Sequence, residues 1–211
     1  MNAATQTVFV VDDTPEVRTA VSRMLGAAGY QVRSFESAEH FFEDQDEEAP
    51  GCLLLDICMP GMSGLDVQRS LVGSSRGRPI VFLTGHGDIQ TSVQAMRVGA
   101  VDFLTKPIDD TRLFAAVDQA LLLDLAARNE RAVRRNIEQR LESLTPRERQ
   151  VMDHVIRGRL NKQIAADLAI REKTVKVHRG CMMAKMHVRS VADLVRLAAK
   201  VEVVKKPAFR T

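Results

Sequence analysis

Residues 52–61 read CLLLDICMPG, an apolar run that ends in one carboxylate, Asp56, and then in a loop. A short apolar run closed by Pro and Gly is typical of a buried strand in a parallel sheet. Other runs end in the same way: Asp12-Asp13 follow 8–11, Thr84 follows 80–83, and Lys106-Pro107 follow 101–105. Since ligands of open parallel sheets bind at the carboxyl ends of strands, these polar residues predict one shared site.

Helical patterns separate these runs, so the first half is expected to be an α/β fold with helices on both faces of the sheet. The first helix is expected to have Thr14 as its cap and Pro15 in its first turn, and to stop at Gly29. Pro107 also favours a cis peptide bond after Lys106. The strands are expected at 7–11, 31–35, 52–56, 79–83 and 101–105, with a further helix at 88–98.

A long stretch from Thr111 to Ser143 contains no Pro or Gly and predicts a linker helix. Its apolar positions suggest either a weak two-helix seam with a polar Asn or a solvated helix that packs locally. The series is Leu122, Leu125, Asn129, Val133, Ile137, Leu141 and Leu144. The expected organisation is domain 1–124, linker 125–143 and domain 144–211.

The second domain begins with LTPRE at residues 144–148. Thr145 as cap, Pro146 in the first turn and Glu148 three residues after the cap make a capping box. Further helices are expected at 161–169, 172–186 and 190–201. Four short helices of this kind fit an all-α helix-turn-helix module that binds DNA.

The composition is that of a globular protein with an aliphatic core, at 45% hydrophobic and 4% aromatic residues. No apolar stretch reaches the roughly 20 residues of a membrane span, and the start has no secretory signal pattern. The three cysteines lack metal-ligand spacing, so reduced thiols in the cytoplasm are expected. Membrane association is not expected.

Charge divides the chain into two parts. Residues 1–124 carry 9 Lys and Arg against 18 Asp and Glu, a net charge of −9. Residues 125–211 carry 21 against 9, a net charge of +12. A swing of this size indicates that the C-terminal part alone meets a polyanion.

The acidic residues have the chemistry of a magnesium site. Mg²⁺ prefers oxygen ligands and keeps several waters, so Asp12, Asp13 and Asp56 suffice to hold it, with the backbone carbonyl of Cys58 as a further ligand. Asp56 can then act as a nucleophile toward a phosphoryl group. Thr84 can donate a hydrogen bond to the phosphoryl oxygens, and Lys106 can pair with another of them.

These motifs together resemble the receiver domain of bacterial two-component response regulators. The matching segments are FVVDD at 9–13, LDICMPGMSG at 55–64, FLTGHGD at 82–88 and GAVDFLTKP at 99–107. The resemblance implies a flavodoxin-like five-stranded parallel sheet of order 2-1-3-4-5. It also implies phosphorylation of Asp56 by a histidine kinase, and a switch made by Thr84 and Phe103. The Gly-His-Gly-Asp loop resembles the FixJ-like branch, although Gln90-Thr91 depart from it.

Residues 144–201 resemble the LuxR-type helix-turn-helix domain of the NarL/FixJ family. LTPRE, NKQIA at 161–165, LAI at 168–170 and TVKVHR at 174–179 carry the likeness. The resemblance makes 172–186 the recognition helix, with Lys176, Val177 and Gly180 facing base edges. The phosphate contacts would be Lys162, Arg171, Lys173, Thr174 and Arg179. The core would contain Ile164, Ala165, Leu168, Ile170, Val175 and Leu194.

Two positions depart from that family pattern. Arg171 stands where a small cap is usual, and it cannot accept the first-turn hydrogen bond. Gly180 lies within the recognition helix, where glycine costs about 1 kcal/mol relative to alanine. It also removes a side-chain contact with a base.

The sequence therefore predicts a transcription factor that is not an enzyme. Phosphorylation would promote a homodimer through the face formed by residues 88–105 and allow binding to promoter DNA, with RNA polymerase as a further partner. Two alternatives remain: a DNA-binding regulator whose receiver is an unphosphorylated scaffold, and a phosphatase on a similar sheet. The basic tail has no purpose in a phosphatase. The sequence does not name the kinase, the operator or the direction of regulation.

Overall fold

The computed structural model describes residues 6–43, 49–72, 77–85, 93 and 95–205. The chain divides into two compact units, Met1–Arg128 and Asn129–Thr211. Each unit has its own hydrophobic core. The two units are therefore treated separately.

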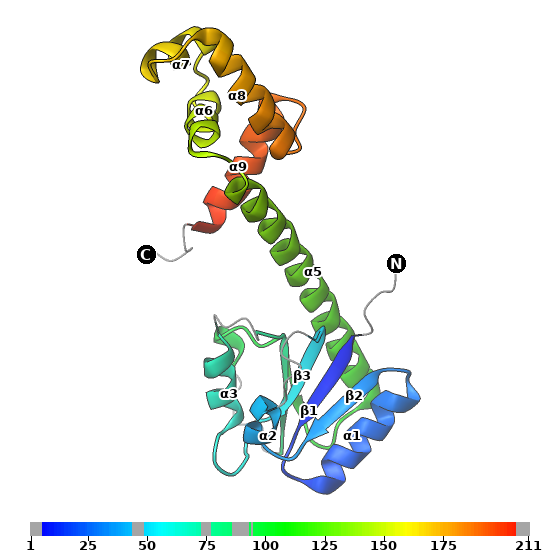
Figure 1. The fold of residues 1–211 in the computed structure, drawn as a ribbon. Coiled ribbons are helices and arrows are strands. Elements are labelled where there is room, and N and C mark those ends of the chain that lie inside the picture. The colour runs from blue at the N-terminus through cyan, green and yellow to red at the C-terminus, as the bar shows by residue number, and fades with distance from the viewer. Residues whose placement is uncertain (1–5, 44–48, 73–76, 86–92, 94, 206–211) are drawn as a thin grey trace. The chain divides into compact units, whose positions relative to one another are not determined.

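The first unit contains one five-stranded parallel sheet (Figure 1). The strand order is β2-β1-β3-β4-β5, which confirms the expected 2-1-3-4-5 arrangement. Each boundary lies within one residue of its expected position. The strands are β1 Thr7–Val11, β2 Gln31–Phe35, β3 Gly51–Asp56, β4 Ile80–Thr84 and β5 Asp102–Thr105.

Helices cover both faces of this sheet, because successive side chains of a strand point to opposite faces. In β1, Val8 and Val10 enter one core cluster together with residues of α1 (Pro15–Ala27) and α5 (Asp110–Glu142). Phe9 and Val11 enter the other cluster with residues of α2 (Ala38–Glu43) and α3 (Gly64–Leu71). The buried strands thus fix the sheet edge where the polar residues emerge.

Thr14 is the N-cap residue of α1, as expected, but its side chain does not cap the helix. Thr14 has the extended backbone of an N-cap residue but makes no side-chain cap hydrogen bond. Its hydroxyl donates instead to Asp13 Oδ1 at 3.4 Å, and its backbone N–H donates to Asp12 Oδ1 at 2.9 Å. The Thr14 hydroxyl thus contacts Asp13 and accepts no hydrogen bond from the first turn of α1, which the sequence pattern does not show.

Other local expectations for this unit are met. Helix α1 ends two residues before Gly29, whose φ is +93°, and the Lys106-Pro107 bond is cis. Most of the helix expected at 88–98 lies outside the described residues, as do three residues of the Gly-His-Gly-Asp loop and the Gln90-Thr91 pair.

The second unit is helical throughout its described elements. It contains the C-terminal part of α5, followed by α6 Pro146–Ile156, α7 Asn161–Asp167, α8 Glu172–Lys185 and α9 Val191–Lys205. Thr145 and Glu148 form the expected capping box at the start of α6. Ile164, Val175 and Leu194 are fully buried, so the expected core is confirmed.

The apolar series of α5, which extends to Leu144 just after the helix, divides into two groups. Ile137 and Leu144 are buried within the second unit. Leu122, Leu125 and Val133 remain 67%, 48% and 50% exposed. Packing within the unit therefore explains only the apolar residues at the C-terminal end of the series. A two-helix seam formed by the exposed residues stays a prediction. Among the described helices, none combines the length and the apolar character that a bilayer span requires.

Candidate functional site

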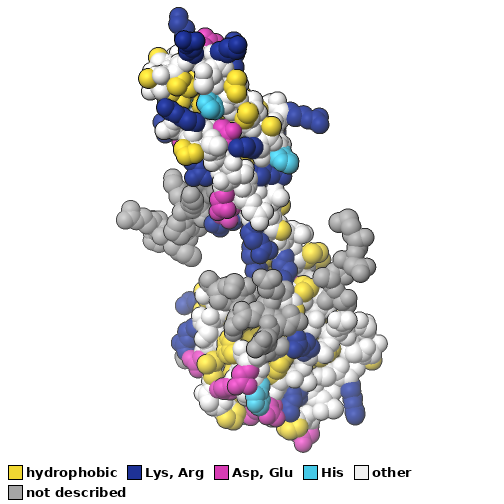
Figure 2. All heavy atoms as spheres, viewed as in Figure 1, with side chains coloured by type: hydrophobic (Ala, Val, Ile, Leu, Met, Phe, Trp, Pro, Cys, Tyr) yellow, Lys and Arg dark blue, Asp and Glu magenta, His cyan; other side chains and the backbone are white. Residues whose placement is uncertain are grey.

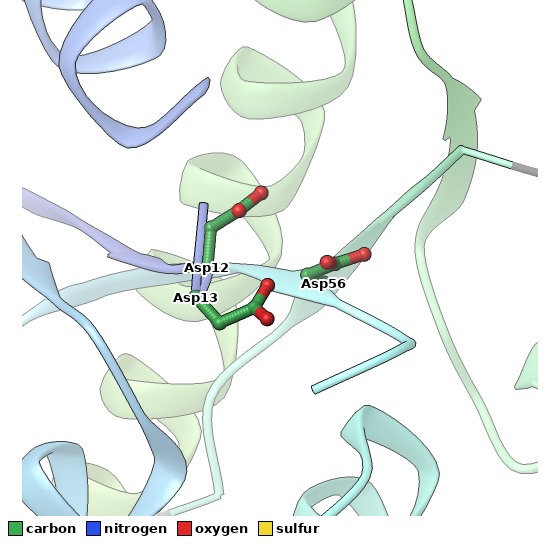
Figure 3. A group of neighbouring side chains, drawn as sticks. All are labelled: Asp12, Asp13 and Asp56. Atoms are coloured by element: carbon green, nitrogen blue, oxygen red, sulfur yellow. The ribbon is translucent and has the colours of Figure 1, made fainter. Parts of the chain in front are cut away.

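Three carboxylates meet at the carboxyl ends of β1 and β3 (Figure 3). These strands are neighbours in the sheet, which brings Asp12 and Asp13 beside Asp56. One ligand oxygen from each residue lies within 4.8 Å of the others. Asp12 is fully buried and Asp56 is 4% exposed, so their charges are poorly screened by water. An all-oxygen donor set of this kind fits a hard divalent cation.

Lys106 supplies positive charge to this site from the end of β5. Its Nζ lies 2.7 Å from Asp12 Oδ2 and 3.2 Å from Asp56 Oδ2. Burial lowers the pKa of the Lys106 ammonium, but hydrogen bonds and charges of Asp12 and Asp56 outweigh burial and raise that pKa above its ordinary value. Lys106 is therefore protonated and bridges the two aspartates.

The pKa of Asp56 is raised above its ordinary value of 3.8. Burial is the largest cause, and the nearby charge of Asp12 adds to it. Lys106 and the backbone of Cys58 act in the opposite direction without cancelling these effects. The negative charge of Asp56 is thus incompletely compensated by protein groups, which is the electrostatic setting that a cation relieves.

The structure brings Thr84 and Lys106 to the same edge, where the Lys106 backbone N–H donates to the Thr84 carbonyl at 2.7 Å. Thr84 is 2% exposed at the end of β4. Phe103 lies on β5 opposite Phe82 and packs half-buried on the second core cluster. Cys58 is exposed in the loop after β3. The expected switch movement of Thr84 and Phe103 stays a prediction.

Sequence reasoning missed two supports of this site. Arg18 of α1 donates a hydrogen bond from Nη1 to the Asp12 carbonyl at 2.6 Å. The two residues are six apart in the sequence, and no sequence motif predicts this contact. A Cβ at Gly64 would lie 2.3 Å from the Asp56 carbonyl oxygen, so only glycine lets α3 start this close to the site. The capping box formed by Ser63 and Asp66 is the signal that could have located this helix start.

Basic residues are spread over the second unit, and several of them lie on or beside α7 and α8 (Figure 2). Lys173, Lys176 and Val177 are exposed on α8, and Lys176 Nζ lies 3.6 Å from Glu172 Oε1. Arg171 is the N-cap residue and makes no side-chain cap bond, as its chemistry requires. Lys162 lies in the first turn of α7 and Thr174 in that of α8, where Thr174 is half-buried.

Arg179 has a protein partner that the sequence did not reveal. Its Nη1 donates to Asn161 Oδ1 at 2.9 Å and joins α8 to the first residue of α7. The guanidinium has further N–H donors, so this bond leaves it able to contact another acceptor. Arg179 therefore fixes the relative position of the two helices of the helix-turn-helix.

A buried acid also organises the second unit. Glu148 is 5% exposed and accepts a hydrogen bond from the Thr145 backbone N–H at 2.9 Å. Lys185 Nζ lies 2.7 Å from Glu148 Oε2 and donates to the Ser143 carbonyl at 3.1 Å. The Lys185 hydrogen bond and then the Thr145 backbone lower the pKa of Glu148. This carboxylate is well compensated, in contrast to Asp56.

Both units match known protein families. Residues 8–118 match the response regulator receiver domain, and residues 142–198 match the bacterial regulatory proteins of the luxR family. The response regulator protein TodT of Pseudomonas putida is 43% identical, over 96% of this chain and 89% of its own length. The transcriptional regulatory protein FixJ of Rhizobium meliloti is 41% identical, over 91% of this chain and 94% of its own.

A solved structure of the response regulator StyR superposes with a TM-score of 0.85 at 48% identity, covering 93% of this chain and 100% of that one. A receiver followed by a luxR-type module defines a two-component response regulator that regulates transcription and is not an enzyme. The chain belongs to the NarL/FixJ-type response regulators.

Proposed function

We propose that a histidine kinase phosphorylates Asp56, and that this modification promotes dimerisation and sequence-specific binding to promoter DNA in the bacterial cytoplasm. The observation that carries the proposal is that the ammonium of Lys106 bridges Asp56 and a second buried acid, Asp12. We propose that the DNA-bound protein activates transcription. RNA polymerase is a partner in that case.

The carboxylate of Asp56 has the position of a nucleophile. It ends a buried strand, so its backbone is held by sheet hydrogen bonds while its oxygens reach the site. Lys106, within 3.2 Å of it, can pair with an oxygen of the transferred phosphoryl group. The Thr84 hydroxyl can donate to another oxygen. Proximity of these groups supplies orientation, which is the main protein contribution to phosphoryl transfer.

A Mg²⁺ ion fits the residues at this site. Asp12, Asp13 and Asp56 would hold it, together with the Cys58 backbone carbonyl. When bound, the ion neutralises charge on the phosphoryl oxygens and on the carboxylates. The raised pKa of Asp56 supports this assignment, because it reports a carboxylate whose charge the protein alone does not compensate.

The proposed dimer face has exposed apolar side chains among its described residues. Val93, Met96 and Val98 are 45%, 46% and 42% exposed. Together with β5 they belong to the stretch 88–105 that the sequence assigned to dimerisation. Neighbouring exposed apolar groups favour a protein contact over solvent.

For DNA we propose base contacts by Lys176 and Val177 and phosphate contacts by Lys162, Arg171, Lys173, Thr174 and Arg179. Val177 is 57% exposed, which suits contact with a thymine methyl group. Arg179 would reach a phosphate through donors that its bond to Asn161 leaves over. A dimer would present two such helices to two half-sites.

The direct test is labelling by acetyl phosphate with Mg²⁺, followed by mass spectrometry of peptides. The wild-type chain is expected to gain one phosphoryl group, located on Asp56. Asp56→Asn should gain none, whereas Asp153→Asn, an exposed residue of α6, should label like wild type. Undiminished labelling of Asp56→Asn would refute the assignment.

A further inference from the structure

Gly180 lies within α8, the helix that the family match makes the DNA-recognition helix. It is exposed, and it shares one face of the helix with Lys173, Lys176 and Val177, at spacings of three and four residues. Val175, Met182 and Met186 occupy the opposite, buried side. Gly180 therefore points away from the protein core and toward the surface offered to DNA.

The fold of the free protein gives no reason for glycine at this position. A Cβ built on Gly180 would meet nothing within 4 Å, and the residue does not have a positive φ. Alanine is the better helix former, because it restricts the unfolded backbone more than glycine does. Gly180 contrasts in this respect with Gly64, whose Cβ would lie 2.3 Å from a backbone oxygen.

Long side chains near Gly180 are directed away from it or are held elsewhere. Arg179 is half-buried and bonded to Asn161 of α7. Lys176 lies one turn earlier, with its Nζ 3.6 Å from Glu172. On the exposed face, the surface at Gly180 is thus bare helix backbone, next to the 57% exposed side chain of Val177.

We propose that Gly180 is the point of closest approach between α8 and the bases, and that its missing side chain sets how deeply the helix enters the major groove. The inference rests on the proposed DNA-binding function. Glycine is the residue that allows a backbone to approach a ligand closely. The depth so gained would bring Val177 and Lys176 within reach of base edges. Gly180 then acts as a specificity-determining position without contacting a base through any side chain.

This proposal predicts effects of opposite sign on stability and on binding. Gly180→Ala should raise the melting temperature of the full chain's DNA-binding unit by about 4 °C, because it removes a helix-interior glycine. The same substitution should weaken binding to specific DNA by about tenfold, because the added methyl group holds the helix away from the bases. A purely structural role for Gly180 would not separate the two effects.

The test uses the full-length chain treated with acetyl phosphate. A duplex is first selected from random-sequence DNA with the wild-type chain, and its affinity is compared with that of a shuffled duplex at one salt concentration. Gly180→Ala should lose affinity for the selected duplex and keep its affinity for the shuffled one. Gly26→Ala is the matched control, since Gly26 is an exposed glycine of α1 whose added Cβ would also meet nothing within 4 Å.

The outcomes separate two failures. If the wild-type chain selects no sequence, or binds both duplexes equally, the proposed sequence-specific function fails. If the wild-type chain discriminates and Gly180→Ala binds the selected duplex equally well, only the close-approach proposal is overturned. Equal losses on the selected and the shuffled duplex also overturn it, because a depth effect on base contacts must reduce the ratio of the two affinities.

Discussion

Asp56 in the first unit and Glu148 in the second are both buried carboxylates, yet the protein shifts their pKa values in opposite directions. Asp56 has a raised pKa because burial and Asp12 outweigh the help of Lys106. Glu148 has a lowered pKa because Lys185 and the Thr145 backbone satisfy it. The protein does not fully compensate the negative charge of Asp56, whereas hydrogen bonds and Lys185 compensate the charge of Glu148.

The difference distinguishes a reactive site from a structural one. A buried acid whose charge is not fully compensated lowers the stability of the protein. Such an acid is typical of a functional site, where a bound cation or a phosphoryl group changes the charge balance. A buried acid whose charge is compensated adds stability in its ionised form, so its charge state is not expected to change. The two units also differ in the charges they present, since three acids of the first unit meet at one site while α8 of the second unit carries exposed cations.

Of the substitutions that test this difference, removal of the Lys106 ammonium should change stability the most. Lys106→Met leaves Asp12 and Asp56 without the ammonium that lies 2.7 and 3.2 Å from them. The first unit is expected to lose about 3 kcal/mol of unfolding free energy at neutral pH without Mg²⁺. Tyr30 is the chain's one tyrosine and there is no tryptophan, so its fluorescence during urea unfolding reports on this unit. An unchanged midpoint would show that Lys106 does not compensate the acids.

Loss of Glu148 should be the next largest effect. Glu148→Gln weakens the capping box and the contact with Lys185, which costs about 2 kcal/mol in the second unit. Because the pKa of Glu148 is lowered, its stabilisation exists above the ordinary value of 4.5 and is lost as pH falls through the folded-state pKa. Hydrogen exchange of the backbone amide of Val151, a buried residue of α6, measures the stability of the second unit at each pH. A cost that persists undiminished at low pH would contradict the electrostatic explanation.

Asp56→Asn should have the smallest effect, and the opposite sign. Since the pKa of Asp56 is raised, its charge destabilises the first unit as pH rises above 3.8, and this penalty is absent below that value. The variant is therefore expected to be more stable than wild type at neutral pH without Mg²⁺, and equal to it in acid. The Tyr30 unfolding curve measures both. Lower stability of Asp56→Asn at neutral pH would mean that Lys106 alone satisfies this acid.

Much of the fold and the site followed from local patterns. Buried strands closed by polar residues located Asp12, Asp56, Thr84 and Lys106 because parallel strands bring their carboxyl ends to one edge. The capping box at Thr145 was correct because its two hydrogen bonds are only three residues apart. Thr14 was placed correctly at the start of α1, but the pattern did not show that its hydroxyl contacts Asp13 and makes no cap hydrogen bond.

The contacts that sequence could not supply join distant elements. Arg18 reaches the Asp12 carbonyl from α1, Arg179 reaches Asn161 from α8, and Lys185 reaches Glu148 from the last residue of α8. Each depends on where two parts of the fold pack against each other, which no periodicity fixes. The need for glycine at position 64, and the absence of such a need at 180, likewise depend on neighbours in space.

The central claim is that charge at Asp56 controls DNA binding by the second unit, and fluorescence anisotropy of a labelled selected duplex tests it most directly. The affinity of the full chain is measured with and without acetyl phosphate and Mg²⁺, for wild type and Asp56→Asn. We expect the phosphodonor to tighten wild-type binding by about tenfold or more, which corresponds to about 1.4 kcal/mol, and to leave Asp56→Asn unchanged. Equal wild-type affinity in both conditions, or the same gain in Asp56→Asn, would contradict the claim.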